Sequence, residues 1–105
     1  SRNNPRPRPA MKELPERLSR TRLQRTLSRL HRPARHCFKR ADILKARTTV
    51  WLRIHGATGR VLEVKVLGKW ANSVPGRCLR RVAKRLRFAR FSEPTQSLRY
   101  PLVLR

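Results

Sequence analysis

The sequence predicts a mixed α+β domain, in which a three-stranded antiparallel sheet is covered on one face by two helices. Apolar residues recur at helical spacing in two segments, over about 16–38 and from residue 73 onward. Two alternating runs, at 48–54 and 60–67, flank a loop with two glycines, and a third alternating run ends the chain. The predicted order is therefore helix, strand, strand, helix, strand.

Residues 1–15 are interpreted as a linker that precedes a single domain of residues 16–105. Pro5, Pro7 and Pro9 alternate with arginines, and this composition favours an extended polyproline conformation that cannot fill a core. The segment is expected to be a plain tether, and a disordered anion-binding arm is the alternative.

A stripe of apolar residues predicts the first helix. Its members lie alternately four and three residues apart and are Leu23, Leu27, Leu30, Ala34 and Cys37. Pro33 lies inside this pattern and lacks the N–H that a regular helix requires. We therefore expect a kink or a short restart of the helix at Pro33.

The two alternating runs in the middle of the chain predict a β-hairpin. In the first run, alternate residues from Thr48 to Ile54 are expected to face the core, with Trp51 on the other side. In the second run, the expected core residues are Leu62, Val64 and Val66. The glycines between the two runs favour a short turn.

The second helix is expected to begin near Ser73, a good N-cap residue, with Pro75 in its first turn. Its predicted apolar arc consists of Cys78, Leu79, Val82, Ala83 and Leu86. A turn at Glu93 and Pro94 then leads to the last strand. The residues expected to share one face of that strand are Leu98, Tyr100, Leu102 and Leu104.

Positive charge dominates the composition. The 105 residues include 28 Lys and Arg but only 5 Asp and Glu, which gives a formal net charge of +23. So much unbalanced charge destabilises a compact fold and favours a polyanionic partner, such as nucleic acid, anionic lipid or an acidic protein. The alternative is that arginine merely occupies exposed polar positions.

Several short motifs occur in an order that is typical of one family. They are CF at 37–38, VWLRI at 50–54, GRV at 59–61, GRCL at 76–79, LRF at 86–88 and YPLVL at 100–104. In this order they resemble the C-terminal domain of TonB-type proteins, closest to the AgmX/PglI variant of envelope and gliding-motility proteins. The sequence departs from that pattern at His55 and Thr58, which replace a usual Asp, at Ala89, which replaces a Pro, and in its high charge.

The resemblance implies a disulfide between Cys37 and Cys78. It also implies a non-catalytic interaction module of a longer protein in the bacterial cell envelope or periplasm, with a protein or an anionic envelope polymer as its partner. From the residues alone, the alternative is that both cysteines are buried, reduced and inert. A closed loop of roughly 40 residues would stabilise the fold by about 3–4 kcal/mol.

Two kinds of binding residue are predicted. The last strand is a candidate sheet edge for strand addition, through Leu98, Arg99, Tyr100, Pro101, Leu102 and Val103. Pro101 lacks an N–H and so fits an edge, although Pro101 and Arg99 could instead only block aggregation. The candidate anion-binding residues are Arg77, Arg80, Arg81, Lys84 and Arg85 on the second helix, and Arg25, Arg29 and Arg32 on the first.

The basic helices also support a second hypothesis, a cytoplasmic domain that contacts the phosphates of nucleic acid. No sequence feature indicates an enzyme, a metal site or a cofactor. The spacing of His31, His36 and Cys37 matches no common zinc motif, and the five acidic residues are scattered. The sequence contains no run of 18 apolar residues, so it predicts no transmembrane segment.

Overall fold

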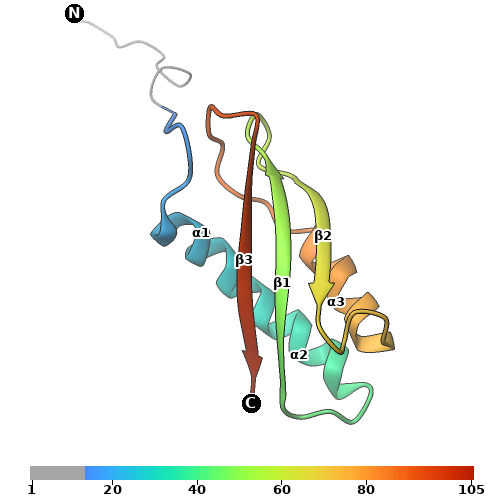
Figure 1. The fold of residues 1–105 in the computed structure, drawn as a ribbon. Helices are drawn as coiled ribbons and strands as arrows, with labels where there is room; N and C mark the ends of the chain where they lie inside the picture. Colours follow the sequence, from blue (N-terminus) through green and yellow to red (C-terminus); the bar gives the residue numbers. More distant parts are fainter. Residues whose placement is uncertain (1–13) are drawn as a thin grey trace, which may run out of the picture.

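The computed structural model describes residues 14–105, so residues 1–13 of the predicted linker lie outside the described part. The elements are α1 (Arg20–Leu27), the 3₁₀ turn η1 (Ser28–Leu30), α2 (His31–Lys39), β1 (Ala46–His55), β2 (Val61–Leu67), α3 (Val74–Lys84) and β3 (Thr95–Leu104). Their order along the chain and the mixed fold class are those that the sequence predicts (Figure 1).

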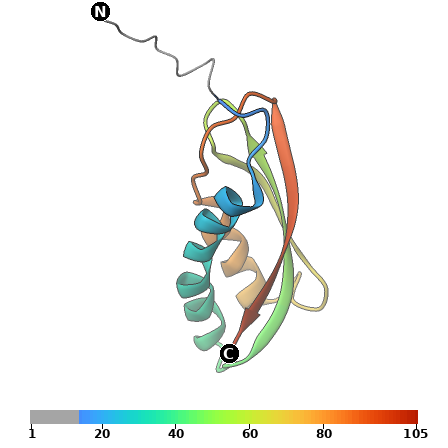
Figure 2. The same ribbon diagram turned by 90° about the vertical axis from the view of Figure 1, so that its left-hand side faces the viewer.

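The three strands form an antiparallel sheet in the order β2-β1-β3. β1 lies in the centre, pairs with β2 from Thr49 to Ile54, and pairs with β3 along its whole length. All helices lie on one face of the sheet, and the other face is bare of described elements (Figure 2). The strand that comes last in the chain is therefore an edge strand.

The first helix begins later and breaks earlier than the sequence predicts. Ser19 caps α1 by accepting a hydrogen bond from the Arg22 N–H at 3.2 Å. The break is the 3₁₀ turn Ser28–Leu30 and does not fall at Pro33, which is the third residue of the restarted helix α2. A proline ring clashes with the carbonyl four residues before it, and the first N–H groups of a helix have no intrahelical partner. The break upstream therefore accommodates Pro33 without the loss of a helical hydrogen bond.

The hairpin forms as predicted, but one of its predicted core residues is wrong. Leu62 is 41% exposed, whereas Val61 is 5% exposed and lies in the core. The register explains the change, because Arg53 pairs with Glu63 and the next residue, Ile54, pairs with Val61. Leu62 is thus the extra residue of a β-bulge, which reverses the alternation for the first residues of β2.

The core lies between the helices and the sheet. The buried alternate residues of β1 face the helices, as predicted, and so do Leu102 and Leu104 of β3. The largest fully buried side chains are Phe38, Phe91, Leu27, Leu30, Leu52, Ile54, Leu79, Leu102 and Val50. α3 starts at its predicted cap, since the Ser73 hydroxyl accepts from the Gly76 N–H at 3.0 Å.

The hairpin loop packs against the segment that joins α3 to β3. The Phe88 N–H donates to the Gly59 carbonyl at 2.8 Å, and the Phe91 N–H donates to the Gly56 carbonyl at 3.0 Å. A Cβ at Gly59 would lie 1.9 Å from the Phe88 carbonyl oxygen, and a Cβ at Gly56 would lie 2.0 Å from that of Glu93. Only glycine allows the two backbones to come this close.

Candidate binding surfaces

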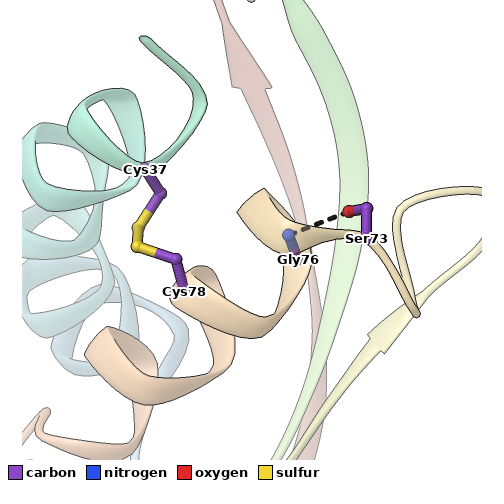
Figure 3. Close-up of a disulfide and its surroundings, with 4 residues drawn as sticks. All are labelled: Cys37, Ser73, Gly76 and Cys78. Atoms are coloured by element: carbon purple, nitrogen blue, oxygen red, sulfur yellow. Dashed lines mark hydrogen bonds between the residues drawn. A yellow bond between two sulfur atoms is a disulfide. The ribbon is translucent and has the colours of Figure 1, made fainter. Parts of the chain in front are cut away.

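A disulfide joins the two helical segments of the domain. Cys37, near the end of α2, is bonded to Cys78 on α3, with the two Cα atoms 5.6 Å apart (Figure 3). The bond connects residues 41 apart in the chain, and no free cysteine is found in residues 14–105. It has no second cysteine pair to exchange with, so its role is to hold α2 and α3 together.

The six residues predicted as a strand-addition edge all lie in β3. β1 pairs with one side of β3, and among residues 14–105 no strand pairs with the other side. Leu102 is buried beneath the helices, whereas Arg99 and Pro101 are exposed on the bare face. Backbone groups of an edge strand are a template for pairing with a further strand.

Hydrogen bonds join the residues just before α1 to the start of β3. The sequence alone does not reveal this contact. The Gln96 side chain, 5% exposed, accepts from the Leu18 N–H at 2.8 Å and donates to the Leu18 carbonyl at 3.1 Å. The Ser92 N–H donates to the Pro15 carbonyl at 2.9 Å. The start of β3 is therefore held against the N-terminal segment, and its free edge is the stretch from about residue 98.

On the helix side, β3 is also tied to α2. The His31 Nε2 atom lies 2.6 Å from the Tyr100 hydroxyl, and the two rings meet edge-on with centroids 5.9 Å apart. Burial raises the pKa of Tyr100 above its ordinary value of about 10, because the charged phenolate is poorly solvated there. The neutral phenol therefore shares one hydrogen bond with the histidine and fixes α2 beside the edge strand.

The eight predicted anion-binding residues are all exposed on the helical layer. They are Arg25 on α1, Arg29 on η1, Arg32 on α2, Arg77, Arg80, Arg81 and Lys84 on α3, and Arg85 directly after α3. None of the eight takes part in the ion pairs of residues 14–105, which join Arg17 to Glu93 and Glu63 to Arg53 and Lys65. Arg77 donates to the Asn72 carbonyl at 2.9 Å, and all eight charges are left without an acidic partner among these residues.

Three of these eight residues are brought to the β2 side of the domain. Arg80, Arg81 and Lys84 line a shallow hollow of about 320 Å³ together with Leu62, Glu63 and Val64. Glu63 is the acid that already pairs with Arg53 and Lys65. This hollow is therefore basic, but it contains a carboxylate that disfavours an anion.

The bare face of the sheet carries a row of three residues, of which only Arg99 belongs to a site that the sequence predicts. Trp51 is paired across the sheet with Lys65 on β2 and with Arg99 on β3. The Lys65 ammonium lies 5.0 Å from the centre of the Trp51 ring. Partners directly opposite each other share a face, so these three side chains stand together on the uncovered side of the sheet.

Two adjoining hollows lie where β1 starts and β3 ends. One, of about 520 Å³, is lined by Lys45, Ala46, Arg47, Lys69, Trp70, Val103, Leu104 and Arg105. The other, of about 460 Å³, is lined by Arg47, Thr48, Thr49, Leu67, Gly68, Lys69, Arg99, Pro101 and Val103. The two share Arg47, Lys69 and Val103, and neither lining contains an Asp or Glu side chain. Sequence reasoning missed this site because its cations come from three separate segments, which are the start of β1, the loop after β2, and β3 with its end.

The described residues contain no arrangement for metal binding. Among them no group of three or more His, Cys, Asp or Glu side chains is placed to hold a metal ion. The His55 Nδ1 atom lies 2.9 Å from the Thr58 hydroxyl within the hairpin loop. Of the helices in this part of the chain, none has the length and apolar character needed to cross a bilayer.

No protein family model, curated protein or solved structure matches this chain. The candidate binding features of the described residues are the edge strand β3, the basic helices and the hollows at the end of the sheet.

Proposed function

We propose that this chain is a non-catalytic binding module that receives an extended segment of a partner protein along the free edge of β3. The position of β3 at the edge of the sheet carries this proposal. From about residue 98 to Leu104, no described strand pairs with its outer side. A strand added there gains main-chain hydrogen bonds, and neighbouring side chains select its sequence.

The charge around the edge favours an acidic partner segment. Of the 28 basic residues, 24 lie in residues 14–105, against four of the five acidic ones. Arg99 is exposed on β3 itself, and Arg47 and Arg105 line the hollow at the end of the strand. Complementary charge speeds association and discriminates against basic partners.

Pro101 determines how such a segment can pair. It has no N–H, and a proline within an edge strand has its nitrogen on the side away from the neighbouring strand, so we infer that a ladder added to β3 lacks one donor here. A partner segment therefore pairs on either side of residue 101 and has to match this gap. The same gap opposes indiscriminate pairing between two copies of the edge.

The module is proposed to belong to a bacterial envelope protein, as its resemblance to the TonB C-terminal domain implies. The disulfide between Cys37 and Cys78 is compatible with this location, because such bonds persist in oxidising compartments such as the periplasm.

The test uses a synthetic peptide of alternating Glu and Val, with binding followed by amide hydrogen exchange. We expect protection of amides in residues 98–104 and no change in β2, Val61–Leu67. Arg99→Glu should weaken binding about tenfold, through repulsion of the acidic segment. Lys65→Glu is the matched control, because Lys65 faces Trp51 from the opposite strand. Protection confined to β2 or to the helices, or equal losses in both variants, would contradict edge binding.

The exposed arginines of the helices support a second candidate function, binding of nucleic acid. If this is the function, random duplex DNA or RNA is retarded in a gel at physiological salt, and the affinity falls log-linearly with salt. Four basic residues lie in the second half of α3 and just after it, and they are Arg80, Arg81, Lys84 and Arg85. Replacement of all four by Glu should abolish the retardation. No retardation at micromolar protein excludes this candidate. Peptide binding along β3 is unaffected by the same reversal.

A further inference from the structure

The two adjoining hollows at the end of the sheet form one groove, and we propose that this groove binds a phosphate group of a phosphate-bearing ligand. The basic residues that line the groove are Lys45, Arg47, Lys69, Arg99 and Arg105. The site uses side chains on the bare face and at the end of the sheet, whereas strand addition uses backbone groups along the edge of β3. The phosphate site shares Arg47, Arg99 and Arg105 with the surroundings of the edge, but it does not require a strand to be added there.

The charge of the groove requires a counter-charge. No Asp or Glu side chain lines either hollow, and none of the five basic side chains is in an ion pair of residues 14–105. Arg47 and Lys69 line both hollows. Repulsion among several cations around one concavity is relieved when a multiply charged anion binds there. The hollow beside α3 differs in this respect, because Glu63 lines it.

The Lys69 side of the groove is held in place before any ligand binds. The Lys69 ammonium lies 5.1 Å from the centre of the Trp70 ring, which in turn packs edge-on against Phe38 in the core, also at 5.1 Å. The Trp70 carbonyl accepts from the Ser73 N–H at 3.1 Å and from its hydroxyl at 2.7 Å. A Cβ at Gly76 would lie 1.8 Å from the Trp70 carbonyl oxygen, so α3 closes tightly on this loop.

This anchoring matters for affinity, because a ligand does not have to order the loop when it binds. Figure 2 shows the segment that follows β2 projecting beyond the sheet on the side away from the helices. Gly68, which has φ +88°, turns the chain out of β2, so that Lys69 lies across the end of the sheet from Arg47. Arg47 and Lys69 thus line both hollows, Lys45 and Arg105 line the first, and Arg99 lines the second.

The residue types in the groove favour phosphate over a single carboxylate. Arg47 and Arg99 present planar forks that match the oxygens of phosphate, and Lys45 and Lys69 add point charges. Phosphate carries up to two charges and several acceptor oxygens, which suits a groove with more than three cations. The volumes of about 520 and 460 Å³ leave room for the group that bears the phosphate.

The test uses the 105-residue chain and inorganic pyrophosphate, with affinity measured by calorimetry at constant ionic strength. The groove variant is Arg47→Gln/Lys69→Gln, and the control variant is Arg60→Gln/Arg87→Gln, which removes the same charge from exposed positions outside the groove and outside the predicted anion-binding residues. We expect the groove variant to bind about tenfold more weakly or worse, and the control to bind nearly as the parent does. Circular dichroism verifies that each variant is folded.

If the groove variant fails to fold, Arg47→Gln/Arg99→Gln replaces it, because that pair leaves Lys69 over Trp70. Equal losses of pyrophosphate affinity in the groove and control variants would overturn the proposal. It would also be overturned if the parent chain bound pyrophosphate no more tightly than it binds sulfate at matched ionic strength. Either of these two outcomes would overturn the phosphate site alone, because peptide binding along β3 is measured separately by amide hydrogen exchange.

A second arm identifies the source of the phosphate. The parent chain and the groove variant are sedimented with phosphatidylcholine vesicles that contain phosphatidic acid. Loss of sedimentation in the groove variant alone assigns the site to a lipid headgroup. Binding of pyrophosphate without sedimentation of the parent assigns it to a soluble phosphate compound. Either result supports a phosphate site in the groove.

Discussion

The variant Cys37→Ala/Cys78→Ala is expected to unfold with a free energy about 4 kcal/mol lower than that of the oxidised parent chain. The two cysteines are 41 residues apart, so the crosslink removes many conformations from the unfolded chain. In a domain of this size the melting temperature falls by about 4 °C or more for each kcal/mol, which gives a decrease of about 15 °C or more. Calorimetric melting of both proteins measures it.

The reduced parent chain provides the control for this prediction. A reductant should lower the melting temperature of the parent to that of the double variant, and it should leave the variant unchanged. Cys37 is only 4% exposed, so the parent has to be reduced in the unfolded state and refolded. If the oxidised parent and the variant melt together, the disulfide contributes nothing to stability. Unbalanced positive charge weakens the fold as a whole, so we expect the loss to be a large part of its total stability.

Gly59→Ala is expected to destabilise the domain by about 3 kcal/mol or more. Gly59 has φ +75°, and a Cβ there would lie 1.9 Å from the Phe88 carbonyl oxygen. That atom belongs to the backbone, so it cannot move away by a change of rotamer. The hairpin loop and the segment after α3 must separate instead, with loss of the hydrogen bond from Phe88 to Gly59. Urea unfolding of parent and variant measures the difference.

Gly68→Ala is the matched control for Gly59→Ala. Gly68 also has a positive φ, +88°, but no atom lies within 4 Å of the position of its Cβ. This variant therefore suffers only the backbone strain of a left-handed residue, about 1–2 kcal/mol. The difference between the two variants isolates the close approach of the two backbones. Equal destabilisation of both would show that the approach at Gly59 has no energetic importance.

The fold was predictable because its signals are local. The alternation of β1, the cap at Ser73 and the apolar stripe from Leu27 to Cys37 all depend on neighbours within a few residues. Only one of the two errors has a tertiary cause. The bulge at Leu62 depends on how β2 meets its partner strand. The break upstream of Pro33 has a local cause, because a proline is tolerated in the first turn of a helix.

The candidate site was predictable only in part. Placement of the last strand at a sheet edge was expected, and the structure has β3 there. Exposure of the helical arginines was expected from their spacing. The groove was not predicted, because Arg47, Lys69 and Arg99 belong to three different segments whose register no local pattern reveals.

The sequence by itself determined the kinds and order of the elements, the faces they bury and the positive charge, since periodicity and composition are properties of short segments. Only the tertiary structure decided the bulge in β2, the approach of the two cysteines and which cations line the groove. Those outcomes depend on contacts between residues far apart in the chain, such as Cys37 with Cys78 and Leu18 with Gln96. Such contacts are selected by the joint packing of all elements around one core.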